Sequence, residues 1–245
     1  MHTQWQKVVL FFLLSIFINT SFAMGLRSLV ALPVEKGGAV LRVAMMGTEE
    51  SARETLTTAL AYGINAQHTL LMGLPYRLSS ATNSSQKNNR LEDMSVLYRH
   101  LVFQQDSWSG TNRFGLLGGA LIPTEQDNES AVQSGFVFTH FKHRHEIDID
   151  AVYQAGQKDR LDSGRFDISW QYRLSPSMYP EWGIPQQINS IVELNGRWLQ
   201  GQDTTQQVTL GLQWLYTQWV IEGGLVKDIN NSKQRHYLFS VRFHF

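Results

Sequence analysis

Charged side chains recur at every second position of short apolar segments, an arrangement that could pair opposite charges or line an aqueous path. Glu146, Asp148 and Asp150, for example, alternate with Ile147 and Ile149. Successive side chains of a β-strand point to opposite faces, so the charges of such a segment share one face. If the segments cross a membrane, that face must turn away from lipid, because an arginine or lysine at the lipid-facing midplane costs roughly 2–4 kcal/mol. The residues that we expect on the inner face are Arg42, Asp93, Arg99, Glu146, Asp148, Asp150, Arg165, Asp167, Arg173, Glu193, Arg197, Glu222 and Arg242.

Histidines and serines offer two further kinds of chemistry, metal binding and nucleophilic catalysis. His140, His143 and His145 have a spacing that could supply imidazole ligands, but strand alternation separates neighbouring side chains across the wall. A serine nucleophile needs a base within hydrogen-bond reach, and the only histidines near inward Ser169 or Ser240 in sequence are those of the latter's own strand. The chain also has no cysteine and no Gly-x-Ser-x-Gly elbow, phosphate loop or dinucleotide fingerprint. We therefore expect no metal, no cofactor and no enzyme, with a lipid hydrolase as the least favoured alternative.

The elements that must position these residues are short strands of alternating polarity, separated by polar turns. Segments of about ten residues with this alternation are typical of membrane β-barrels. Twelve such strands are expected, at about residues 39–47, 53–62, 66–78, 91–103, 113–123, 131–141, 145–156, 164–174, 188–199, 205–216, 218–228 and 236–245. An even number suits a closed antiparallel barrel, so the sequence predicts an all-β transmembrane barrel. Most even-to-odd turns are short, but the segments 104–112 and 175–187 suggest two longer connections.

The last predicted strand has the clearest alternation, and the chain ends on a phenylalanine. Its apolar face comprises Tyr237, Phe239, Val241, Phe243 and Phe245. This terminal pattern resembles the sorting signal that the barrel assembly machinery of the outer membrane reads. We expect the strand to close the barrel against the segment around Leu41 to Met45, which brings Arg242 near Arg42.

The first 23 residues look like a cleavable signal peptide. Lys7 precedes an apolar run of about eleven residues, and Ser21 to Ala23 supply small residues before the expected cleavage site. Residues 24–245 then form one domain, exported to the outer membrane of a Gram-negative cell and surrounded by its lipid. Removal of Lys7 leaves 20 basic against 21 acidic residues, a balance that argues against nucleic-acid binding.

Two early segments resemble the outer-membrane family called "MetA-pathway of phenol degradation". One is the stretch from Leu60 to Asn65, with a strand ending in Tyr-Gly, and the other leads to Gly73-Leu74-Pro75-Tyr76. The stretches Met94 to Arg99 and Leu117 to Thr124 continue the likeness. The resemblance implies a barrel that serves as a transporter or channel, often for hydrophobic or aromatic compounds. It supplies no catalytic set.

These observations predict a passive outer-membrane channel for a small-molecule solute. The inner charges could line an aqueous path, or they could neutralise one another and brace the wall. The second possibility would suit a structural barrel that presents surface loops and transports nothing. A barrel of about twelve strands is wide enough for a small molecule only if side chains and loops leave a gap.

Overall fold

The computed structural model describes residues 25–48, 54–78, 90–125, 129–175, 186–230 and 234–245. The expected signal peptide, residues 1–23, lies outside this part of the chain. Within it, no helix is long and apolar enough to cross a bilayer.

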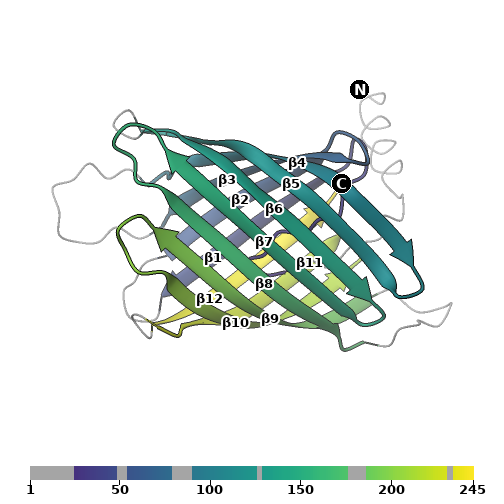
Figure 1. Ribbon diagram of the computed structural model, residues 1–245. Helices are drawn as coiled ribbons and strands as arrows, with labels where there is room; N and C mark the ends of the chain where they lie inside the picture. The colour runs from purple at the N-terminus through teal and green to yellow at the C-terminus, as the bar shows by residue number, and fades with distance from the viewer. Residues whose placement is uncertain (1–24, 49–53, 79–89, 126–128, 176–185, 231–233) are drawn as a thin grey trace, which may run out of the picture.

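Twelve antiparallel strands close into one barrel, as the sequence predicts (Figure 1). Each strand pairs with its sequence neighbours, and β12 returns to pair with β1, so the sheet has no open edge. The strands are β1 (Ala39–Thr48), β2 (Glu54–Gly63), β3 (His68–Arg77), β4 (Met94–Ser107), β5 (Gly110–Ile122), β6 (Ala131–Lys142), β7 (His145–Gly156), β8 (Ser163–Arg173), β9 (Gln186–Leu199), β10 (Thr205–Tyr216), β11 (Trp219–Asp228) and β12 (Arg235–His244).

The predicted closure of the barrel is confirmed in its register. Arg42 lies opposite Arg242, and Val43 lies opposite Val241. Phe245 donates its N–H to the carbonyl of Ala39 at 2.8 Å, so β1 begins and β12 ends at the same end of the barrel. We call this the terminal end. The opposite end, where odd strands connect to even ones, is the loop end.

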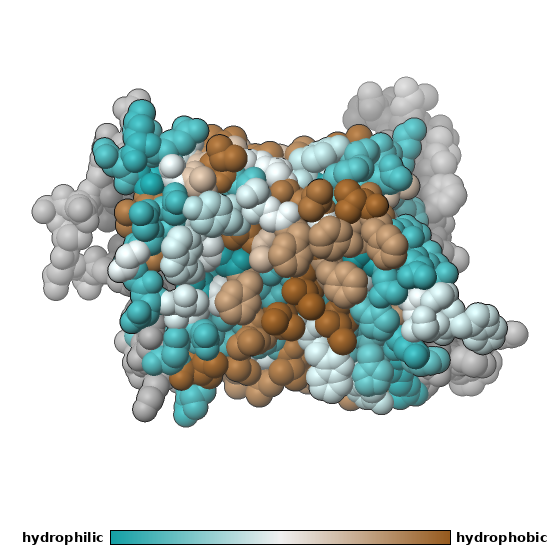
Figure 2. Space-filling model, viewed as in Figure 1, coloured by the Kyte–Doolittle hydropathy of each residue, from teal (hydrophilic) through white to brown (hydrophobic). Residues whose placement is uncertain are grey.

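Alternation divides the strands into an apolar outer face and a polar inner face. On β10, Leu210 and Leu212 are 55% and 58% exposed, whereas Thr209 and Gln213, which flank them in sequence, are buried. Hydrophobic residues gather over the middle of the visible face, and hydrophilic residues gather at both ends (Figure 2). Such an apolar band between polar rims is the surface of a membrane barrel.

The predicted long connection at residues 104–112 is wrong. β4 continues to Ser107 and β5 begins at Gly110, which leaves a two-residue turn. The register shifts between Leu101 and Phe103, so the alternation breaks there although the strand continues. Gly110 has a φ of 128°, a conformation that lets the turn stay tight.

Candidate functional site

The centre of the barrel is occupied by the chain's own N-terminal segment. Residues 25–34, which we call the strap, precede β1 and lie inside the lumen. Leu26, Val30 and Ala31 are 1%, 3% and 0% exposed. Gly37 donates its N–H to the carbonyl of Gly63 at 2.8 Å, where the chain leaves the lumen and turns into β1. Sequence reasoning assigned no role to this segment.

Acceptors on β6, β7 and β9 bind the main-chain N–H groups of the strap. The N–H of Arg27 lies 3.2 Å from both carboxylate oxygens of Glu193. The N–H of Leu29 donates to Asp150 at 2.7 Å, and that of Ala31 donates to the Thr139 hydroxyl at 2.9 Å. Both carboxylates and the Thr139 hydroxyl therefore accept hydrogen bonds directly from the main chain of the strap.

Two arginines from the other half of the barrel bind main-chain carbonyls of the strap. Arg42 on β1 donates to the carbonyl of Leu26, and Arg99 on β4 donates to that of Val30. Arg99 also donates to the Thr69 hydroxyl at 2.9 Å. Of the predicted inner charges, four thus contact the strap: Arg42, Arg99, Asp150 and Glu193.

Apolar side chains of the strap pack into two apolar clusters of wall residues, which we call seats. Leu26 clusters with buried Ile191, Val226 and Leu238. It also lies against Gly211 and Gly224, which are paired on β10 and β11. A side chain on either glycine would clash with Leu26, because its Cβ would lie 2.2 Å (Gly211) or 2.9 Å (Gly224) from a Leu26 methyl carbon. Ala31 occupies the second seat, a cluster with Leu101, Leu117, Val137 and Val152. The hydrophobic core of the molecule therefore lies around the strap.

Seven of the predicted inner charges, two of which also contact the strap, form two main ion-pair groups. Glu222 lies 3.0 Å from Arg42 and 2.9 Å from Arg242, and so bridges two arginines that face each other in the register. On the other side, Arg165 pairs with Asp150 at 3.0 Å and with Asp167 at 2.6 Å. Arg197 adds a second cation to Asp167 at 2.8 Å. These pairings favour the bracing interpretation for most of the inner charges.

Glu146, Asp148 and Arg173 lie toward the terminal end of the inner face. Asp148 is fully buried and accepts hydrogen bonds from Thr139 at 2.7 Å and from Gln171 at 2.8 Å. Within the described residues, Oε1 of buried Glu146 and Nε of Arg173 have no hydrogen-bond partner. Glu146 Oε1 can accept a hydrogen bond and Arg173 Nε can donate one.

Asp93 differs from its expected place within a strand. β4 begins one residue later, and Asp93 pairs with Arg160 of the β7–β8 connection at 2.6 Å. The regular ladder between β3 and β4 ends at Gly73 and Ser95. Pro75 follows on β3 and has no N–H to continue it. Asp93 therefore ties two connections together at the loop end.

The candidate histidines and serines form no metal-binding group in the described part of the chain. No group of three histidine, aspartate or glutamate residues there could hold a metal ion. His140 contacts Asn112 at 2.7 Å, and His143 has a φ of 57° in the β6–β7 turn. Ser240 donates to Glu222, and Ser169 Oγ has no hydrogen-bond partner.

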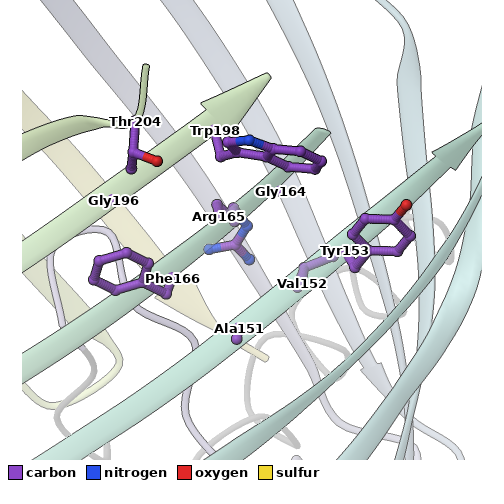
Figure 3. A pocket seen from close by; sticks show the side chains of 9 residues that line it. All are labelled: Ala151, Val152, Tyr153, Gly164, Arg165, Phe166, Gly196, Trp198 and Thr204. Atoms are coloured by element: carbon purple, nitrogen blue, oxygen red, sulfur yellow. The ribbon is translucent and has the colours of Figure 1, made fainter. Parts of the chain in front are cut away.

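An apolar groove lies on the outer wall near the loop end (Figure 3). It is an open cavity of about 310 Å³, and Tyr153, Phe166 and Trp198 supply its aromatic side chains. The Phe166 ring covers Gly196 in its floor, and the Tyr153 and Trp198 rings stack on either side of Gly164 with centroids 6.1 Å apart. This groove faces away from the strap and would face lipid.

The proposed assembly signal occupies the outer face of β12. Phe239 and Phe245 are exposed, and Phe243 packs against Trp219 and Phe245 with ring centroids 4.5 and 4.6 Å apart. Tyr237 donates its hydroxyl to Glu54 at 2.8 Å. These positions suit contact with lipid, and their recognition by the assembly machinery stays a prediction.

Solved structures share this architecture. A KdgM porin superposes with a TM-score of 0.54 and 7% identity, over 84% of this chain and 99% of the porin. The COG4313 outer membrane channel from Pseudomonas putida F1 gives a TM-score of 0.56 and 15% identity, over 92% of this chain and all of that channel. The chain thus has the fold of outer-membrane β-barrels. Its sequence matches no protein-family model and no curated protein, so the resemblance to the phenol-degradation family stays a prediction.

Proposed function

We propose that the chain is an outer-membrane channel of a Gram-negative cell, closed at rest by its own strap and passing small polar solutes when the strap moves. The loop end would face outside, and the terminal end would face the periplasm. The observation that carries this proposal is the polar interior of the barrel, where Asp148, Asp150 and Glu193 are buried behind an apolar outer wall. The porin and channel names of the structures with this fold add support.

A polar solute suits this lumen better than the hydrophobic or aromatic compounds that the family resemblance implies. An apolar molecule inside the barrel would offer no hydrogen bond to buried charges such as Glu146. Apolar compounds would instead find the aromatic groove of Figure 3 on the outer wall.

The strap also favours a second candidate, a structural barrel that conducts nothing. Planar-bilayer conductance of the purified full-length mature protein distinguishes the two. We expect a small conductance that rises several-fold in the double variant Leu26→Asp/Ala31→Asp, because both new carboxylates would be buried in apolar seats and would expel the strap. Lys36→Asp adds a carboxylate at an exposed position and should change little. A barrel that stays sealed in the double variant would overturn the channel and support the structural role.

A further inference from the structure

The wall holds the strap mainly by its main chain, and the side chains of Arg27 and Ser28 add three further hydrogen bonds. The contacted groups are the N–H groups of Arg27, Ser28, Leu29 and Ala31 and the carbonyls of Leu26 and Val30. Every residue except proline carries such groups. We propose that the lumen is a binding site for an extended peptide backbone, and that short peptides are the solute class of this channel. This inference rests on the proposed function and names its substrate.

The donors and acceptors of the site are separated in space. Acceptors come from β6, β7 and β9 through Thr139, Asp150 and Glu193, and donors come from β1 and β4 through Arg42 and Arg99. β1 and β7 are half a turn of the barrel apart in the strand order. A ligand that spans the lumen must therefore offer donors to one half and acceptors to the other. An extended peptide does so, whereas a simple anion or cation meets only one half.

Contacts to side chains of the strap are fewer and define a loose preference. Leu26 packs in the seat that contains the two glycines. Ala31, five residues later, packs in the other seat, which holds a small apolar side chain. Between them, the Arg27 guanidinium donates to Gln207 at 2.5 Å and to Asn195 at 3.3 Å. The expected ligand is a peptide with an aliphatic residue near one end and a small residue near the other.

The burial of these wall groups explains why the site needs an occupant that forms hydrogen bonds. Thr139, Asp150, Glu193 and Arg99 are all buried. A buried charge without a hydrogen-bond partner is unfavourable, so the site stays occupied by the strap, by water or by another amide-bearing molecule. The strap is then an internal competitor of the peptides that the channel would admit.

Binding of a peptide in trans tests the inference. The probe is a fluorescently labelled peptide with the sequence of residues 25–36, added to the full-length mature Leu26→Asp/Ala31→Asp protein in detergent micelles. We expect saturable binding by fluorescence anisotropy and block of the conductance in bilayers. Wild-type protein should bind the probe more weakly, because its own strap competes.

The decisive control keeps the sequence and removes hydrogen-bond donors. N-methylation at the positions of Leu29 and Ala31 removes the donors to Asp150 and Thr139, and should weaken binding by about tenfold or more. N-methylation at the positions of Glu35 and Lys36, which are exposed, should leave binding unchanged. In the wall, Thr139→Val should weaken binding and Thr139→Ser should restore it.

Two results would overturn the inference. One is equal binding of the peptide methylated at 29 and 31 and of its parent. The other is no saturable binding to a double variant that conducts. In both cases conduction by the double variant would leave the channel function standing, so the two proposals fail separately.

Discussion

The inner and outer faces of the same strands are stabilised in different ways. On β7 and β8, the inner residues Asp148, Asp150 and Asp167 are fully buried and hydrogen-bonded, while the outer residues Tyr153 and Trp170 stay exposed. The inner face is stabilised by specific pairing among charges and with the strap. The outer face needs only to be apolar, because lipid makes no directional contacts. The effect of an inner-face substitution on stability should therefore depend on which partners are lost. The effect of an outer-face substitution should depend on its depth in the bilayer.

The largest expected effect lies at the inner bridge between β1, β11 and β12. Glu222→Leu leaves Arg42 and Arg242 facing each other without the carboxylate that joins them. Breaking a buried ion pair by removing one partner costs about 3–5 kcal/mol, so the free energy of unfolding in lipid vesicles should fall by that amount. Adding Arg242→Met should recover part of the loss, since one buried cation is then gone. A Glu222→Leu protein as stable as wild type would show that water, rather than pairing, solvates this part of the lumen.

On the outer face, the free-energy cost of a charged substitution should depend on its depth in the bilayer. Leu210 lies near the middle of β10 and points outward. Leu210→Arg should lower the free energy of unfolding in lipid vesicles by roughly 2–4 kcal/mol. Gln206→Arg, on the same face but close to the loop end, should cost about 0–1 kcal/mol. Equal effects of the two substitutions would contradict the placement of the membrane across the middle of the strands.

The outer face was also the easier one to predict. Alternation on β8, β10 and β12 is regular because lipid and lumen impose a strict period of two, and this fixes strand number and register in advance. The bulge in β4 breaks the period at Leu101, so the strand appeared to end early. Asp93 escaped prediction because the regular ladder between β3 and β4 ends at Gly73 and Ser95, and Pro75 on β3 was not used as a sign that the ladder stops there.

The strap could not be predicted from periodicity, since its main chain carries most of its polar contacts. Main-chain groups are identical in every sequence, so no residue type signals that Arg42 and Asp150 bind them. One signal was available. Residues 26–32 are largely apolar and yet precede the first alternating strand, and such a segment must be buried somewhere.

The smallest expected effect lies at the rim, where the outer aromatic residues meet the loops. Tyr153 donates its hydroxyl to Asp162 at 2.5 Å, and the Gly156 N–H donates to the same carboxylate at 2.8 Å. Both hydrogen bonds hold the pKa of Asp162, in the β7–β8 connection, below its usual value. A lowered pKa means that this carboxylate contributes stability above the ordinary aspartate pKa, and that the contribution is lost as pH falls through the lowered value. Tyr153→Phe should raise the pKa of Asp162 only part of the way, because the Gly156 bond remains. A pH titration of the Asp162 carboxyl carbon by NMR measures the shift, with Tyr76→Phe elsewhere on the outer face as control. An unchanged pKa in Tyr153→Phe would show that the loop, and not the aromatic rim, positions this carboxylate.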